Sequence, residues 1–178
     1  MNFSPGKLPG VWIVDQEPRG DARGSLTKNF CAEIFASQGL ETNWSQQLST
    51  FTAETGTIRG MHWQADPSPE TKLIRCTRGR VFDVLVDIRP GSDTYGQWES
   101  QILSGDEARS LYAPGCFAHG LQTLAPNCEM NYLISAAYDT DLQRGFRWDD
   151  PEVGIVWLEA NPILSERDSS LPLLIDVE

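Results

Sequence analysis

The chain has 178 residues, a mass of 19.8 kDa and a formal net charge of −11, because 25 Asp and Glu outnumber 14 Lys and Arg. This length fits one domain spanning residues 1–178, since two halves would each have a thin hydrophobic core. So acidic a chain has no general attraction for nucleic acid or for an anionic membrane surface, and we expect neither as a partner.

Short segments separated by turn residues follow one another along the chain, which contains 15 glycines and 11 prolines. One helix is predicted at residues 32–38, with Gly39 as its stop signal. A polar run occupies residues 166–170, and we expect residues 171–174 after it to pack back on the body. The predicted strands lie at residues 11–14, 57–64, 72–77, 81–89, 98–103, 109–113, 120–124, 129–135 and 155–158.

The strand at residues 81–89 has the clearest pattern. Its even positions are apolar, whereas Asp83, Asp87 and Arg89 occupy odd positions. A period of two predicts a strand with one face in the core. Gly79, between two arginines, predicts a turn before it, so residues 72–77 form the other arm of a hairpin.

Many short strands, without repeats or a linker, favour a mainly β fold. We expect an antiparallel β-barrel or jelly roll of the cupin type, with few short helices. A Pro-Gly pair at residues 114 and 115, shortly before His119, also suggests a cupin.

Four cysteines, Cys31, Cys76, Cys116 and Cys128, are irregularly spaced and form no Cys-x-x-Cys pair. This spacing favours buried free thiols in a reducing compartment over a zinc site or a disulfide framework. We recognise no signal peptide, and no apolar stretch approaches the roughly 20 residues of a membrane span. The sequence therefore predicts a soluble, cytoplasmic protein.

The chain contains two histidines, His62 and His119. Many cupins bind a metal through several histidines and a carboxylate, but here Gln64 follows His62 where a metal-binding cupin would offer a second histidine. Two histidines are a meagre ligand set for a transition metal, so we expect no metal.

His62 could instead act as a base. A neutral histidine accepts a proton near pH 7, and a carboxylate is needed to fix its tautomer. Asp66, Asp83 and Asp168 are all candidates for that carboxylate, and the residues alone do not choose among them.

Tyr132 and Lys72 could complete such a site, Tyr132 as an acid on the opposite side and Lys72 as a cation beside a developing oxyanion. This combination suits proton abstraction next to a carbonyl group, followed by reprotonation from the other face. Each residue also has an ordinary structural interpretation: a hydrogen-bonded histidine, a core tyrosine and a solvent-facing lysine. The three lie on different predicted strands, so both interpretations stay open.

Several sequence blocks, in order along nearly the whole chain, resemble one known family. They are GDARG at 20–24, RGMHWQ at 59–64, KLIR at 72–75, GRVFDV at 79–84, VDIRPGS at 86–92, YGQW at 95–98, PGCFAHG at 114–120, WDDP at 148–151 and ILSERD at 163–168. The chain resembles the dTDP-4-dehydrorhamnose 3,5-epimerases, which are cupin-like sugar-nucleotide enzymes.

The resemblance implies epimerisation at C3 and C5 of a nucleotide-linked 4-keto-6-deoxysugar, with dTDP-4-dehydro-6-deoxy-D-glucose as the default substrate. It implies no metal and no redox cofactor. It further implies a nucleotide-diphosphate sugar as the ligand, and a homodimer in which an N-terminal strand is shared between subunits.

The resemblance also implies roles for individual residues. His62 matches the family's general base, Asp168 its carboxylate partner, Tyr132 the general acid and Lys72 the residue facing the keto oxygen. Tyr138 matches a tyrosine that stacks on the nucleotide base. The positions that contact substrate in the family hold Arg23, Lys28, Gln47, Ser49, Arg59, His119, Tyr138, Gln143 and Arg167.

The binding periphery departs from the family pattern. Lys28 and Gln143 stand where the family usually has Glu, Ser49 stands at a usual Asn, Phe51 at a usual Ser and Arg167 at a common Lys. These departures leave open a different nucleotide or sugar, and inversion at C3 alone or C5 alone. A sugar-nucleotide-binding or metal-binding cupin without epimerase activity is a further alternative.

Overall fold

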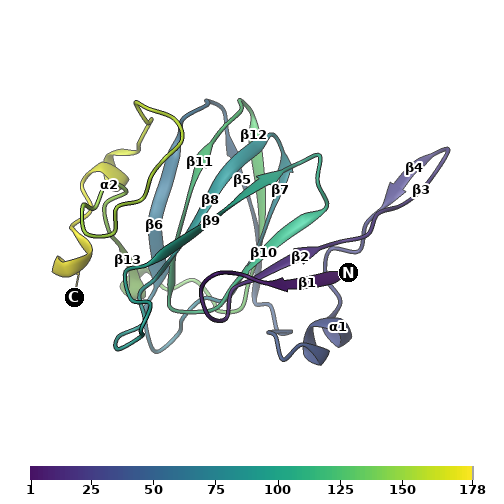
Figure 1. Ribbon diagram of the computed structural model, residues 1–178, viewed down its shortest axis with the longest axis horizontal. Coiled ribbons are helices and arrows are strands. Elements are labelled where there is room, and N and C mark those ends of the chain that lie inside the picture. The colour runs from purple at the N-terminus through teal and green to yellow at the C-terminus, as the bar shows by residue number, and fades with distance from the viewer. Residues whose placement is uncertain (178) are drawn as a thin grey trace.

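Two antiparallel sheets pack against each other in the computed structural model, which describes residues 1–177 (Figure 1). One sheet has the strand order β1-β2-β10-β7-β12-β5, and the other has the order β13-β6-β11-β8-β9. The strands are β1 (Asn2–Pro5), β2 (Trp12–Asp15), β5 (Gln46–Thr52), β6 (Ile58–Gln64), β7 (Lys72–Arg78), β8 (Arg80–Asp87), β9 (Trp98–Ser104), β10 (Arg109–Ala113), β11 (Phe117–Thr123), β12 (Cys128–Ile134) and β13 (Gln143–Gly145).

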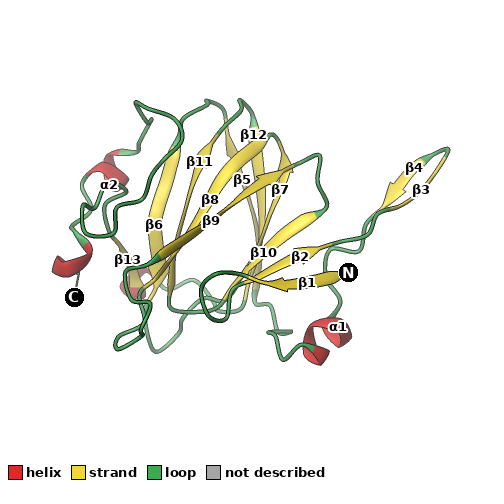
Figure 2. Cartoon of the chain, in the orientation of Figure 1, coloured by secondary structure: helices red, strands yellow, loops and turns green. Residues whose placement is uncertain are grey.

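Helices are short and peripheral (Figure 2). They are α1 (Ala32–Ser37), α2 (Glu166–Ser169), η1 (Thr140–Leu142) and η2 (Leu174–Asp176). Gly39 has φ of 71° just after α1, which confirms it as the stop signal. The predicted mainly β, cupin-like fold with few short helices is therefore confirmed.

Strand β8 is buried on both faces. Val81 and Leu85 join the cluster between the two sheets, whereas Phe82, Val84 and Val86 pack outward in a second cluster. The prediction of a single core face is wrong, because the C-terminal segment covers the outer face with side chains such as Phe146, Val153 and Trp157.

The strand predicted at residues 155–158 is also wrong, since this stretch has no regular structure. It alternates like a strand because Ile155 and Trp157 pack on the outer cluster while Val156 and Leu158 are exposed. No strand within residues 1–177 pairs with it. The Leu158 amide instead donates to the side-chain oxygen of Gln122, which replaces a ladder partner.

The other predicted strands are confirmed with ends displaced by up to three residues, and Gly79 forms the predicted turn with φ of 78°. Strands β1, β5 and β13 were not anticipated. Residues 171–174 do pack back: the Pro172 carbonyl accepts from the Arg147 amide, and the Leu174 amide donates to Asp150.

A hairpin of β3 (Arg19–Asp21) and β4 (Gly24–Leu26) projects from the body (Figure 1). All residues of both strands are exposed, including Leu26 with 76% of its surface accessible. This hairpin was not anticipated either.

All four cysteines are free thiols, but the expectation that they are buried holds only for Cys76 and Cys128; Cys31 and Cys116 are half-buried. None of the helices in residues 1–177 has the length and apolar character needed to cross a membrane.

Candidate active site

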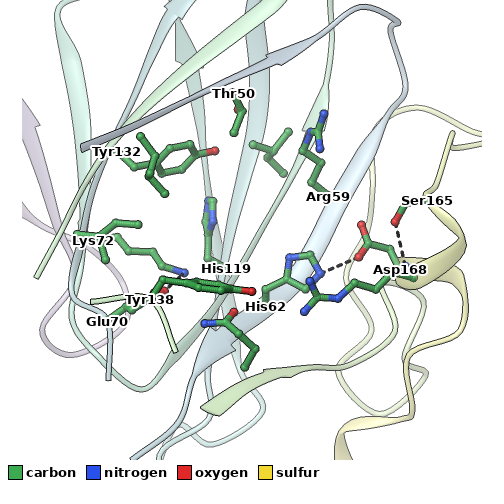
Figure 3. Close-up of a pocket in the computed structure, with 15 residues that line it drawn as sticks. Thr50, Arg59, His62, Glu70, Lys72, His119, Tyr132, Tyr138, Ser165 and Asp168 are labelled. Atoms are coloured by element: carbon green, nitrogen blue, oxygen red, sulfur yellow. Dashed lines mark hydrogen bonds and ion pairs between the residues drawn. The ribbon is translucent and has the colours of Figure 1, made fainter. Parts of the chain in front are cut away.

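A pocket of about 370 Å³ opens between the two sheets and is closed on one side by the C-terminal segment (Figure 3). Both sheets contribute, with the side chains of β5, β7 and β12 facing those of β6 and β11. The lining residues are Leu48, Thr50, Arg59, His62, Glu70, Lys72, His119, Leu121, Tyr132, Ile134, Tyr138, Gln143, Ser165, Arg167 and Asp168. All four predicted catalytic residues therefore meet in one cavity.

Asp168 on α2 holds the imidazole of His62 on β6. The distance from His62 Nε2 to Asp168 Oδ1 is 2.7 Å. Burial alone would raise the pKa of Asp168, but hydrogen bonding and charge from His62 outweigh burial and lower it. The ionised carboxylate can only accept, so Nε2 carries the proton and Nδ1 keeps its lone pair.

Asp168 is itself fixed by the start of α2. The side chain of Ser165 caps this helix and accepts from the Asp168 amide at 3.0 Å. The geometry chooses Asp168 among the three candidate carboxylates, because Asp83 bonds His119 and Asp66 lines a different hollow beside Cys116.

Strands β6 and β11 approach each other closely two residues before His62. Gly60 has φ of 134°, and a Cβ built on it would lie 2.6 Å from the Cα of Gly120. Only glycine fits here. Two residues later His62 pairs directly with His119 across the two strands.

Lys72 lies at the start of β7 with its ammonium 3.4 Å from Glu70 Oε2. Burial lowers the pKa of Lys72, and the negative charges of Glu70 and Asp83 offset part of that change. A buried ammonium with a nearby carboxylate can donate to an oxygen that gains negative charge.

Tyr132 on β12 faces the pocket from the sheet opposite His62 (Figure 3). Burial raises the pKa of its hydroxyl well above the usual value, and the charge of Asp83 adds to the effect. The phenol is therefore protonated at neutral pH and can supply a proton. Its ring meets the edge of His119 with centroids 5.9 Å apart, and His119 Nε2 is 3.0 Å from Asp83.

The pocket's outer rim is cationic and aromatic. Arg59 donates from Nε to the Thr52 hydroxyl at 3.0 Å, and Arg167 lies exposed on α2. Tyr138 lies across the pocket entrance with 57% of its surface accessible (Figure 3). Such a rim can hold an anionic, partly aromatic ligand although the whole chain is acidic.

Four predicted binding residues lie outside this pocket. Arg23 is at the hairpin tip, 90% exposed and paired with Asp21 at 2.6 Å, and Lys28 lines a separate hollow near Met1. Gln47 and Ser49 alternate with the pocket-facing residues of β5, so they lie on its other face.

Sequence reasoning missed three apolar lining residues, Leu48, Leu121 and Ile134, and three polar ones, Glu70, Thr50 and Ser165. Ser165 had a readable signal, since Ser three residues before Asp is a typical helix start. Glu70 and Thr50 had none. Within residues 1–177, no three His, Cys, Asp or Glu side chains come together as metal ligands.

Comparison with known proteins points to one family. A family model described as dTDP-4-dehydrorhamnose 3,5-epimerase matches residues 5–176. A dTDP-4-dehydrorhamnose 3,5-epimerase of Sinorhizobium fredii is 38% identical over 178 residues, covering 99% of this chain and 91% of the relative. A dTDP-4-dehydrorhamnose 3-epimerase of Streptomyces niveus is 34% identical, covering 99% of this chain and 85% of the relative.

A solved structure gives the same answer. The dTDP-4-dehydrorhamnose 3,5-epimerase of Bacillus anthracis, with TDP and PPi bound, superposes with a TM-score of 0.94 at 36% identity. The match covers 97% of this chain and 98% of the other.

Proposed function

The chain belongs to the dTDP-4-dehydrorhamnose 3,5-epimerase family, and on that premise we propose that the pocket around His62 inverts C3 and C5 of a nucleotide-linked 4-keto-6-deoxysugar. The default substrate is dTDP-4-dehydro-6-deoxy-D-glucose, and the product is dTDP-4-dehydro-L-rhamnose. The observation that carries the proposal is a paired base on one sheet and a protonated phenol on the other, with a buried ammonium on β7, the strand next to that of the phenol.

The proposed chemistry is two proton transfers at each carbon. His62 Nδ1 takes the proton from the carbon beside the C4 ketone, and the electron pair moves onto the C4 oxygen as an enolate. Lys72 donates to that oxygen and offsets its charge. Tyr132 then gives its proton to the opposite face of the carbon as the enolate electron pair returns to it, and the imidazolium and phenolate exchange protons with solvent before the second carbon reacts. No step changes an oxidation state, so the reaction needs no redox cofactor.

The rim supports binding of the nucleotide diphosphate. Arg59 and Arg167 can neutralise the diphosphate, Tyr138 can stack on the base with Gln143 held nearby through Gln64, and His119 can bind the sugar. We assign these five residues to substrate binding, together with Arg23, Lys28, Gln47 and Ser49, which match family substrate positions although they lie outside this subunit's pocket. Free thiols and a nucleotide-sugar substrate suit the cytoplasm.

We further propose a homodimer. Arg23 is a family substrate position, yet it stands on a hairpin whose strands are exposed throughout. The hairpin tip can serve a pocket only if that pocket belongs to a second subunit. The outer face of the six-stranded sheet, where Gln47 and Ser49 lie, offers the matching surface.

Mixed dimers test this arrangement. His62→Ala subunits have a dead pocket but an intact hairpin, and Arg23→Ala subunits have the reverse. If the hairpin acts across the dimer, mixing the two inactive or weakened proteins restores activity, because one pocket in each mixed dimer is complete. If mixing restores no activity, Arg23 either serves the pocket of its own subunit or has no role in the reaction.

The main experiment is incubation with dTDP-4-dehydro-6-deoxy-D-glucose in deuterated water, with deuterium at C3 and C5 read by NMR. Label and inversion at both carbons support the 3,5-epimerase. Label at one carbon alone supports a mono-epimerase, the activity named for the Streptomyces niveus relative that is 34% identical. No label in a folded protein that binds dTDP supports a binding cupin without catalysis.

A further inference from the structure

A buried glutamine, Gln64, joins the two loops that close one end of the pocket. It lies on β6 with 1% of its surface exposed. Its Nε2 donates to the carbonyl oxygens of Ser68 at 2.7 Å and Ala137 at 3.0 Å. Its Oε1 accepts from the amide of Asp139 and from Nε2 of Gln143, both at 2.9 Å. All four hydrogen-bonding positions of this side-chain amide are therefore used.

These partners fix which end of the Gln64 amide is which. Carbonyl oxygens can only accept and a backbone N–H can only donate, so the oxygen of Gln64 must face Asp139. Gln143 must then turn its NH₂ group toward Gln64, which leaves its own oxygen for the pocket. A glutamate at position 143 would have no proton to donate to Gln64.

The two loop contacts that matter most lie on either side of Tyr138. Ala137 and Asp139 are both bonded to Gln64, whereas the ring of Tyr138 is 57% exposed at the pocket entrance (Figure 3). An aromatic ring with so little packing depends on its backbone for its position. Gln64 holds that backbone from both sides.

The loop before Lys72 depends less on Gln64. The Thr71 amide donates to the Ser135 hydroxyl at 3.0 Å, and Lys72 itself pairs with Ala113 and Ile134 in the sheet. Loss of Gln64 would therefore leave the ammonium of Lys72 in place while the backbone around Tyr138 loosens.

We propose that Gln64 is a positioning residue, which sets Tyr138 and Gln143 for the nucleotide end of the substrate and takes no part in proton transfer. The inference rests on the proposed function, because it requires a nucleotide sugar as the ligand. Gln64 does not line the pocket; it acts through the two residues that it holds.

The test is Gln64→Met, which keeps the length of the side chain and removes all four hydrogen bonds. We expect dTDP to bind about tenfold more weakly by calorimetry, since stacking on an aromatic ring contributes about 1–3 kcal/mol and only part of it is lost. KM should rise by a similar factor, while kcat stays within about threefold of the wild type.

Gln122→Met is the matched control. Gln122 is equally buried, lies on the neighbouring β11, and bonds the backbone of Leu158 and Glu159 outside the pocket. The Gln122→Met variant should lose about as much thermal stability as Gln64→Met, but its affinity for dTDP should stay unchanged. If both variants weaken dTDP binding equally, the effect is general loosening and the proposal is wrong.

A double variant identifies the route of the effect. In a Tyr138→Ala background, Gln64→Met should weaken dTDP binding by less than about twofold further, because its main target is already gone. Full additivity would overturn the proposal, as would unchanged dTDP affinity in Gln64→Met. Should Gln64→Met not fold, Gln64→Asn removes the reach to the loop with a smaller disturbance. Since dTDP binding needs no turnover, a wild type that binds dTDP but epimerises nothing would refute only the proposed function.

Discussion

Replacing Asp168 with asparagine should leave the pocket folded but supply the wrong tautomer of His62. The carboxylate accepts from Nε2 of His62 at 2.7 Å and is also hydrogen-bonded by Ser165 and the amide of Gly60. An asparagine must put its NH₂ group on one side. Facing Gly60 it would meet another donor, at a cost of about 1–3 kcal/mol, so it turns toward His62 instead. The proton of His62 then moves to Nδ1, where the base is needed.

Two losses combine in this variant. The tautomer penalty is about 1–2 kcal/mol, and the missing negative charge beside the imidazolium costs about 2–3 kcal/mol at the effective dielectric of a half-buried pair. At 1.36 kcal/mol for each tenfold change in rate, we expect kcat to fall by about 10² to 10⁴.

Deuterium exchange from solvent into C3 and C5, followed by NMR, measures this loss without requiring inversion. Asp149→Asn is the control, because Asp149 pairs with Arg147 at 2.7 Å outside the pocket. Binding of dTDP to Asp168→Asn should be unchanged, which shows that the fold persists. An exchange rate that stays above about a tenth of the wild-type rate would refute the tautomer argument.

Three further changes test other parts of the site. Tyr132→Phe should leave exchange at the base-facing side measurable but slow inversion by about 10² or more, read as labelled but unepimerised substrate; unchanged epimerisation would remove Tyr132 as the acid. Glu70→Gln removes a negative charge that raises the pKa of Lys72, so the alkaline limb of the pH–activity profile should move to lower pH. An alkaline limb that does not move would contradict the pairing of Glu70 with Lys72. Gly60→Ala should cost about 3 kcal/mol or more in the free energy of unfolding, measured by denaturant titration, because its Cβ would lie 2.6 Å from the backbone of β11; a Tm shift below about 2 °C would show that the strands can separate.

The alternation of β8 illustrates what a sequence can and cannot predict. A period of two located the strand and its turn at Gly79, because those depend on local geometry. It could not reveal that the outer face is covered, since that cover comes from residues near Val153 and Trp157, far along the chain. The same cover explains the false strand at residues 155–158, whose alternation records packing on β8 and not pairing.

The proposed catalytic set was predictable only in part from the residues themselves. His62 stood out because the chain has two histidines, and the residues alone left three carboxylates as its partner. The family resemblance pointed to Asp168, and the fold brings Asp168 to 2.7 Å from His62. The contact spans 106 positions in the chain, which no local pattern encodes. Glu70 escaped notice because a carboxylate in a loop has no signature until burial places it beside Lys72.

The reacting end and the nucleotide end of the pocket differ in how they are held. His62, Lys72 and Tyr132 stand on strands with paired neighbours on both sides, so the fold itself fixes their geometry. Tyr138 stands on a loop, where a few side-chain bonds supply its position, and Arg23 stands on a projecting hairpin, where the proposed second subunit would supply it. A substitution at the first end alters the chemistry directly, whereas one at the second end changes which nucleotide sugar is accepted. Of the departures from the family pattern, Gln143 lies at the second end, whereas Lys28 and Ser49 lie outside the pocket. None of the three is among the residues proposed to move protons, so we expect them to affect substrate choice and not proton transfer.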